Sequence, residues 1–391
     1  MSYRLSADLI QLRESARQFA KERLAPIAME VEAKGAPFPR QTLKEMASAG
    51  MLGLDIPREY GGQGLNVLAT CVAMEELAGG WFSATSYAAA MTAGPILEAG
   101  TPEQKARYLP RVASGDFITA VAMSEPNVGS DATSLETYAE PVEGGYSISG
   151  TKLFITNADV ADALLVFART AASGEKRRVA TMFIVNKGSL GMSLVRKIKA
   201  LAHSANPIWE IKFQQCFVPQ TNVVGEVGCA FESMQVGFAK TRSYYAARCV
   251  GVAQAALDYA AHYAQERQQF GQMIAQHQGI RFKLADMQSS IEACRCLTYR
   301  AATLVDESAA DAAVAVAMAK LQASDMAMKV VSEAIQIMGG QGYTCDHPLE
   351  RYYREAKLFQ IGDGSCEILR LIISSDSNRR ARKNERVALP D

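Results

Sequence analysis

A single carboxylate flanked by two glycines stands out near the end of the chain. Asp363 lies between Gly362 and Gly364, shortly before a segment around Cys366 that is predicted to begin a helix. A carboxylate held in a site with little water gains basicity and can remove a proton from a substrate. An aspartate just before a helix can instead cap its first turn. The residues alone leave both interpretations open.

Other segments place glycines, hydroxyls, aromatic rings or an arginine at short spacings. Each has an ordinary explanation when taken alone, such as a turn between strands or a helix that ends at a glycine. In chain order these segments are Ala122 to Asp131, Phe154 to Thr156, Arg267 to Gln278, and Gln336 to Gly340.

Together with the C-terminal segment, these motifs resemble, in type and order, those of the acyl-CoA dehydrogenases. Members of that family are flavoenzymes that remove two hydrogens from an acyl thioester. The resemblance covers essentially the whole chain, and five motifs in family order are difficult to obtain by accident. It implies the acyl-CoA dehydrogenase fold, an α+β architecture with an N-terminal helical domain, a central antiparallel β domain and a C-terminal four-helix bundle.

The resemblance implies an FAD site. Within one subunit, Met123 and Ser124 line the flavin ring, Ser130 reaches the pyrophosphate, Phe154 covers the ring, and Thr156 donates near N5, the atom that accepts the hydride. In relatives a second group reaches the FAD of a neighbouring subunit: Arg267 at the pyrophosphate, Phe270 and Gln278 near the adenosine, and Gln336, Gly339 and Gly340 as close backbone. Ser365 and Glu367 join from the C-terminal motif.

The same resemblance indicates which residue is the base that removes the α-proton of the substrate. Most members carry a glutamate where this chain has Asp363, preceded by a tyrosine where this chain has Gly362. Some members place the base at a second position, which corresponds to Thr241, and a threonine cannot act as a base. Asp363 is therefore the favoured base, with Arg242 and Gly364 at the substrate. Aspartate is shorter than glutamate by one bond, roughly 1.5 Å, which matters when reacting atoms must nearly touch.

Two departures from the family pattern concern the carrier of the acyl group. The segment from Ala200 to Trp209 lacks the arginine of the Gly-x-Arg-x-Ser pattern, and His203 is either a substitute or an ordinary polar residue. Ala239 stands where relatives that bind CoA often have an acidic residue. These two differences count against free CoA as the carrier of the acyl group. The Asn206-Pro207 loop is similar to the corresponding loop of relatives that act on carrier proteins.

Composition sets wider limits. The 391 residues include 41 basic and 41 acidic side chains, so no bulk attraction to nucleic acid or to an anionic membrane is expected. A run of about 18 apolar residues, as a membrane helix needs, is absent from the sequence. The eight cysteines lack metal-binding spacing, and we expect reduced thiols in the cytoplasm and no metal.

Periodicity predicts helices, then strands, then helices. Ser6 is predicted to cap a helix that Pro26 interrupts, and Thr101 with Pro102 to open another. After Gly115 come short segments rich in Val, Ile, Phe and Thr, which are typical of strands. The predicted strands are 117–123, 146–149, 163–168, 179–185, 192–198 and 208–213, and the predicted long helices are 230–267, 280–307 and 310–338. We predict domains at 1–116, 117–228 and 229–391.

The sequence therefore predicts FAD-dependent α,β-dehydrogenation of an acyl thioester carried by CoA or by a carrier protein. Asp363 would take the α-proton and flavin N5 the β-hydride. Electrons would pass to an electron-transfer flavoprotein or to oxygen, and the shared FAD site implies a homotetramer or homodimer. Two alternatives remain: an acyl- or aminoacyl-carrier-protein dehydrogenase or oxidase, and a flavin-binding member without desaturase chemistry.

Overall fold

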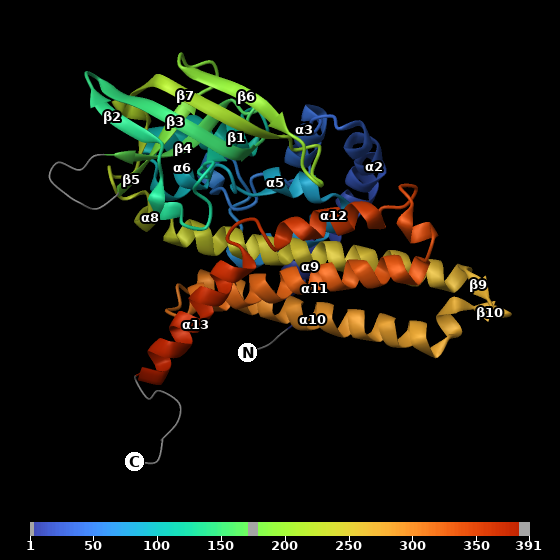
Figure 1. The fold of residues 1–391 in the computed structure, drawn as a ribbon. Coiled ribbons are helices and arrows are strands. Elements are labelled where there is room, and N and C mark those ends of the chain that lie inside the picture. The colour runs from blue at the N-terminus through green and yellow to red at the C-terminus, as the bar shows by residue number, and fades with distance from the viewer. Residues whose placement is uncertain (1–3, 171–178, 383–391) are drawn as a thin grey trace, which may run out of the picture. The chain divides into compact units, whose positions relative to one another are not determined.

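A computed structural model describes residues 4–170 and 179–382 of the chain (Figure 1). The chain forms two compact units. The first contains Met1–Glu22, Asn66–Phe82 and Ala239–Asp391, and the second contains Arg23–Leu65 and Ser83–Phe238. The predicted boundaries of three domains, at 116/117 and 228/229, remain a prediction.

The N-terminal third is helical, as predicted. Its helices are α1 (Ala7–Phe19), α2 (Ala25–Lys34), α3 (Arg40–Ser48), α4 (Val67–Gly80), α5 (Thr85–Ala88), α6 (Gly94–Ala99) and α7 (Pro102–Ala113). Ser6 caps α1, and Thr101 forms a capping box with Gln104 at α7, which confirms both predicted starts. Pro26 does not interrupt the first helix: a π-helical segment follows α1, and the proline occupies the first turn of α2, where its missing N–H costs nothing.

The second unit contains the sheet. Its strands are β1 (Thr119–Ala122), β2 (Tyr138–Val142), β3 (Gly145–Thr156), β4 (Ala163–Thr170), β5 (Val179–Asn186), β6 (Met192–Ile198), β7 (Ile208–Pro219) and β8 (Val223–Val224). They lie in the order β6-β7-β3-β2-β4-β5-β8, with β1 also paired to β4. The pairs are mostly antiparallel, as predicted, but β1 and β2 both pair with β4 in parallel. Strand β2 was not predicted, and it contains Pro141, a residue that is unusual inside a strand.

The first unit contains the long helices. They are α9 (Gln235–Glu266), α10 (Gln278–Asp306) and α11 (Ala312–Met338), followed by α12 (Leu349–Phe359) and α13 (Cys366–Arg382); the short α8 (Ala230–Ser233) precedes them in the chain. Helices α9, α10 and α11 run side by side and share one apolar core with residues of α4 and α12 (Figure 1). A short hairpin of β9 (Gln268–Gln269) and β10 (Gln272–Met273) joins α9 to α10.

Buried polar contacts attach α4 to α10 within this unit. Glu75 of α4 accepts hydrogen bonds from Arg295 Nε at 2.8 Å and from the Tyr299 hydroxyl at 2.9 Å. Asp306, at the end of α10, accepts the first two N–H groups of α4 at 2.7 and 3.1 Å. These contacts hold the N-terminus and the middle of α4 against α10, because each satisfies groups that would otherwise lack partners.

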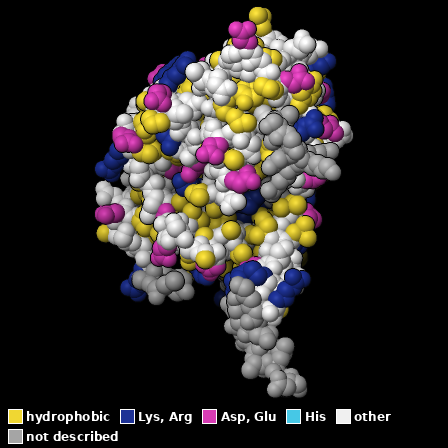
Figure 2. Space-filling view, turned by 90° about the vertical axis from the view of Figure 1, so that its left-hand side faces the viewer, with side chains coloured by type: hydrophobic (Ala, Val, Ile, Leu, Met, Phe, Trp, Pro, Cys, Tyr) yellow, Lys and Arg dark blue, Asp and Glu magenta, His cyan; other side chains and the backbone are white. Residues whose placement is uncertain are grey.

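Charges of both signs are interspersed over the face drawn in Figure 2, in keeping with the zero formal charge of the chain. Among the helices of the described residues, none combines the length and the apolar character that crossing a membrane requires.

Candidate active site

Asp363 lies in a tight loop between α12 and α13. The loop begins where the Gly362 N–H donates to the Leu358 carbonyl at 2.8 Å. Asp363 and Gly364 then both adopt positive φ, at 54° and 92°. A positive φ is uncommon for a residue other than glycine and marks a constrained backbone position.

Two cations from other helices bind the carbonyl groups of this loop. The Lys320 amine of α11 donates to the Gly364 carbonyl at 2.7 Å, and Arg242 Nε of α9 donates to the Asp363 carbonyl at 3.3 Å. The structure thus brings together Asp363, Gly364 and Arg242, the three residues predicted for catalysis and substrate binding. Lys320, which is fully buried, was missed.

The Asp363 carboxyl group is buried on one side, and one of its oxygens can accept a further hydrogen bond. Its Oδ2 atom is buried and lacks a hydrogen-bond partner among the described residues. Burial raises the pKa of this carboxyl, while the charge of Arg242, a hydrogen bond with Thr241 and the charge of Lys320 oppose the rise. A buried carboxylate with a free oxygen and a raised pKa is the arrangement a general base needs.

Asp363 was also interpreted as the residue that caps α13. Another residue has that role. The Ser365 hydroxyl accepts the N–H of Ile368 at 3.4 Å, so Ser365 caps the first turn of α13. Ser365 itself was predicted to contact the cofactor, which the cap does not test. Glu367 follows it on the exposed side of α13.

Aromatic and cationic side chains surround the loop on the α9 side. The Arg248 guanidinium lies 4.1 Å from the centre of the Phe82 ring and 4.7 Å from that of Tyr245. Sequence reasoning missed Tyr245 and Arg248. A charged residue in a stretch of alanine, cysteine and valine was a usable signal, because an arginine there is buried only with partners.

A buried ion pair supports the predicted flavin loop of the second unit, which is the segment from Ala122 to Asp131. Lys152 and Glu125 are both buried, with Lys152 Nζ 2.7 Å from Glu125 Oε1 and 2.9 Å from the Met123 carbonyl. The second oxygen of Glu125 accepts the Glu136 N–H at 2.6 Å. The Leu153 N–H donates to the Ser124 carbonyl at 2.8 Å, which ties the loop to β3. Ser130, further along, is exposed.

Strand β3 bulges beside this loop and presents Phe154. A register shift against β7 falls between Lys152 and Ile155, where Phe154 has a φ of +62° and stays 59% exposed. Thr156 follows it in the strand. On β7, the register partner of Ile155 is Trp209, whose indole N–H is buried and lacks a partner among the described residues. An exposed ring, a hydroxyl and an orphan donor beside a fixed loop fit a planar, polar ring system such as flavin.

The other predicted FAD residues lie in the first unit and are exposed. Phe270 is 95% exposed and, with Gly271, has positive φ, so the two form the turn of the β9–β10 hairpin. The interpretation of this motif as a helix end is therefore wrong. The further exposed residues of this group are Arg267, Gln278, Gln336, Gly339 and Gly340.

His203 belongs to a buried polar network in the second unit. Its Nε2 lies 2.7 Å from Asn206 Nδ2 and 3.4 Å from the Ser86 hydroxyl. Asn206 in turn donates to the Ser83 carbonyl at 2.9 Å and accepts from the Tyr87 hydroxyl at 3.2 Å. These contacts favour the interpretation of His203 as an ordinary polar residue over that of a substitute for the missing arginine.

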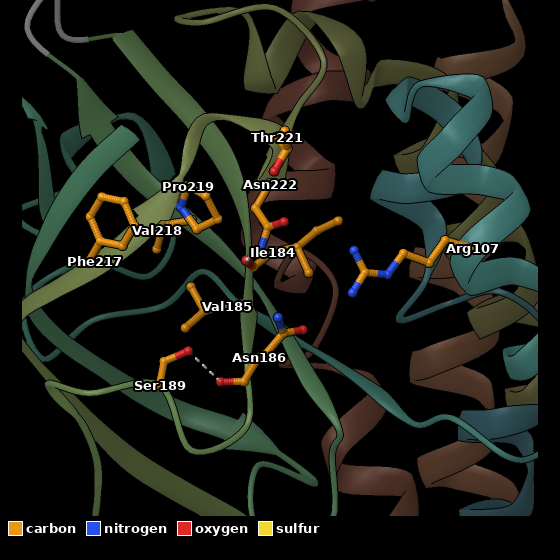
Figure 3. A pocket seen from close by; sticks show the side chains of 10 residues that line it. All are labelled: Arg107, Ile184, Val185, Asn186, Ser189, Phe217, Val218, Pro219, Thr221 and Asn222. Carbon is orange, nitrogen blue, oxygen red and sulfur yellow. Dashed lines mark hydrogen bonds between the residues drawn. The ribbon is translucent and has the colours of Figure 1, made fainter. Parts of the chain in front are cut away.

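The second unit also has a surface pocket of about 200 Å³, which other residues line (Figure 3). Arg107 of α7 points toward it from the side opposite Ile184 and Asn222, and the Ser189 hydroxyl bonds the Asn186 carbonyl at 2.8 Å. Its lining contains none of the predicted site residues, so it plays no part in the chemistry considered below.

Comparison with known proteins agrees with the motifs. The family models for the acyl-CoA dehydrogenase N-terminal, middle and C-terminal domains match residues 6–116, 120–216 and 231–377. An acyl-CoA dehydrogenase of Bacillus subtilis is 40% identical over 375 residues, which are 95% of this chain and 98% of that one.

Solved structures give the same result. Butyryl-CoA dehydrogenase from Megasphaera elsdenii is similar with a TM-score of 0.91 and 34% identity, over 97% of this chain and 100% of that one. The prolyl acyl carrier protein oxidase AnaB is similar with a TM-score of 0.88 and 29% identity, over 95% and 99%. This chain belongs to the acyl-CoA dehydrogenase family, whose members bind FAD and are oxidoreductases acting on CH–CH groups.

Proposed function

We propose that the protein desaturates an acyl thioester and that Asp363 is the base that removes the α-proton. The observation that carries this proposal is the buried Oδ2 atom of Asp363, which lacks a partner among the described residues. An oxygen in that state is available to accept a proton from a substrate carbon. The positive φ of Asp363 supports the same role, because constrained backbone is often found at active sites.

The neighbours of Asp363 favour its ionised form and oppose the rise in pKa that burial causes. The positive charges of Arg242 and Lys320 and the Thr241 hydrogen bond all favour the charged form, against the effect of burial on its pKa. The two cations also bind the loop carbonyls, so the carboxylate is positioned as well as charged. This arrangement lets a short aspartate be held firmly in place of the longer glutamate.

FAD, when bound, supplies the acceptor for the β-hydride. In the second unit, Met123, Ser124 and Ser130 would hold it through the loop that Glu125 and Lys152 support, with Phe154 and Thr156 against the ring. We assign Arg267, Phe270, Gln278, Gln336, Gly339 and Gly340 to the FAD of a neighbouring subunit, with Ser365 and Glu367 from the C-terminal motif. Their exposure, above all that of Phe270, favours a dimer or tetramer.

The carrier of the acyl group is CoA or a carrier protein. Similarity to butyryl-CoA dehydrogenase supports the first, and similarity to AnaB supports the second. The loop from Ala200 to Trp209 favours the carrier protein, because it lacks the family arginine and His203 is engaged in a buried network. The electron acceptor, an electron-transfer flavoprotein or oxygen, and a cytoplasmic location remain predictions.

The substitution Asp363→Asn tests the base. It keeps the shape of the side chain and removes its ability to take a proton, so anaerobic bleaching of the flavin by substrate should slow by at least about a hundredfold. Asp346→Asn, at an exposed loop carboxylate, is the matched control and should bleach at the wild-type rate. Bleaching of Asp363→Asn at near wild-type rate would exclude Asp363 as the base and favour a flavin-binding member without desaturase chemistry.

The carrier and the electron acceptor are tested with the wild-type protein. Butyryl-CoA and butyryl thioesters on a carrier protein are mixed separately with the oxidised enzyme without oxygen, and the bleaching rates are compared. Rapid bleaching by the CoA ester would count against the carrier-protein alternative. Reoxidation is then followed with dissolved oxygen and with an electron-transfer flavoprotein in turn.

A further inference from the structure

Gly362, the residue before Asp363, is packed against a tyrosine of another helix. A Cβ atom built on Gly362 would lie 2.7 Å from the hydroxyl oxygen of Tyr245 and 3.4 Å from its Cζ. Gly362 is absent from the residues with positive φ, so its backbone would accept any side chain. The requirement for glycine at this position therefore comes from Tyr245 and not from the turn.

The Tyr245 ring is held in this position on several sides. Phe359 packs edge-on against it, with ring centres 6.2 Å apart, and the Lys320 amine lies 5.8 Å from the ring centre. The Arg248 guanidinium covers the ring at 4.7 Å. Moving the ring to make room at Gly362 would break all three contacts, so the position of the hydroxyl is set by the packing of α9, α11 and α12.

The Tyr245 hydroxyl retains a proton that it can donate. Arg248 forms a hydrogen bond with this hydroxyl, and a guanidinium can only donate, so the phenol oxygen accepts. Burial is the largest influence on the group and raises its pKa to about 12. The phenol is therefore neutral at physiological pH, and its O–H is a hydrogen-bond donor beside the loop that carries Asp363.

We propose that Tyr245 is a specificity-determining residue whose hydroxyl donates to an oxygen on the acyl group. The substrate class is then an acyl thioester with a hydroxyl, carbonyl or carboxylate oxygen on its chain, in preference to a plain hydrocarbon chain. This inference rests on the proposed function, because it assumes that the acyl group lies against Asp363.

The physical reason for this preference is the free-energy cost of burying a hydrogen-bond donor without an acceptor. The Tyr245 side chain is half-buried. A hydrocarbon chain that displaced water from the hydroxyl would leave its proton without an acceptor, whereas an oxygenated chain would replace the lost hydrogen bond. Sites that hydrogen-bond a substrate group discriminate strongly against analogues that lack it.

The specificity test compares matched thioesters. The wild-type kcat/KM should be roughly tenfold or more higher for the 4-hydroxybutyryl thioester, whose hydroxyl lies off the reacting carbons, than for the butyryl thioester on the same carrier. Tyr245→Phe should reduce this ratio toward one, since it removes only the hydroxyl. Tyr263→Phe, at another partly buried tyrosine of α9, should keep the wild-type ratio. A wild-type preference for the plain chain, or an unchanged ratio in Tyr245→Phe, would overturn the proposal.

A second measurement tests the packing without using catalysis. Gly362→Ala should lower the melting temperature in the wild-type background and be nearly neutral when Tyr245→Ala has removed the ring. Equal losses in both backgrounds would show that Tyr245 does not determine the glycine. If Asp363→Asn abolishes bleaching but Tyr245→Phe leaves the ratio unchanged, only the specificity inference fails. If Asp363→Asn bleaches normally, the proposed function itself fails.

Discussion

At Asp363, two opposing influences set the affinity for a proton. Burial favours the neutral acid, whereas Arg242, Thr241 and Lys320 favour the carboxylate. A base that must be ionised before the reaction and protonated after it benefits from such a balance, because its pKa can lie near the working pH. Under the proposed function, the residues around the carboxylate therefore influence the pH range in which the base is ionised.

Thr241→Val should move the acid limb of the pH profile of kcat/KM to higher pH. The Thr241 hydrogen bond lowers the pKa of Asp363, so its loss raises that pKa, and the ionised fraction falls at any given acidic pH. Measuring kcat/KM from acidic to neutral pH checks the direction. A limb that stays in place, or that moves to lower pH, would contradict either the hydrogen bond or the role of Asp363 as the base.

Asp363, Arg242 and Gly364 could be predicted as site residues because each belongs to a local motif, and their roles stay predictions. Tyr245 and Lys320 could not be predicted in this way, since their importance depends on contacts between helices far apart in the chain. The close approach of Tyr245 to Gly362 depends on how α9 packs against the loop after α12. Residue types and spacing carry no such information.

Among the elements, the flavin loop of the second unit depends on one buried ion pair. Lys152 bonds both Glu125 and the Met123 carbonyl, while Glu125 holds the backbone at Glu136 and Thr137. The loop that is predicted to bind the cofactor is thus fixed to β3 before any cofactor arrives. Such preorganisation reduces the entropy lost on binding.

Lys152→Met should lower stability and FAD affinity together. Removing one partner leaves the Glu125 charge buried, which costs about 3–5 kcal/mol, and frees the Met123 carbonyl. Thermal unfolding and FAD titration of the apoprotein check the two effects. Lys187→Met, at a lysine whose bond to the Asp159 carbonyl is exposed, is the control and should change little. An unchanged FAD affinity in Lys152→Met would mean that the ion pair supports the fold but not the cofactor site.

Asp306→Ala should destabilise the first unit through α4. The carboxylate accepts the N–H groups of Val67 and Leu68 from the end of α10, so its loss removes a cap, at a cost of about 1–2 kcal/mol. Asp311→Ala, which breaks a surface pair with Arg300 at the start of α11, where the Asp311 side chain makes no capping hydrogen bond, should cost less than about 0.5 kcal/mol. Chemical unfolding of both variants measures the difference, and similar losses would show that the cap is not important for stability.

Elements were predictable where their signals are local. Capping residues such as Ser6 and Thr101 mark real helix starts, because they act within one turn. The parallel pairing of β1 with β4 was not predictable, since it joins segments about 40 residues apart in the chain that carry no mark of direction. The Phe270 hairpin turn was missed because both of its strands are only two residues long.

At the scale of the whole molecule, the order of the motifs identified the family. The exposure of the predicted FAD residues adds which of them a neighbouring subunit is expected to cover. The predicted FAD residues divide into a group beside β3 in the second unit and an exposed group in the first. Phe270 is an apolar ring that is almost fully exposed at a hairpin tip, which is unfavourable unless something covers it. We expect a neighbouring subunit to cover it.

A shared site predicts that two inactive variants can rescue each other. Ser130→Ala weakens the half of the site that a subunit uses for its own FAD, and Arg267→Ala weakens the half that it gives to its neighbour. In a mixed pair, one site has both defects and the other has neither, so random mixing should restore about a quarter of the FAD sites.

The experiment is to unfold and refold the two variants together and to measure bound FAD and flavin bleaching. The same variants refolded separately are the control and should show little of either. Recovery only after mixing would mean that Ser130 and Arg267 act on one FAD from different subunits. No recovery, in oligomers shown to contain both variants, would place both residues at the FAD of a single chain, because a site built within one chain cannot be completed by its neighbour.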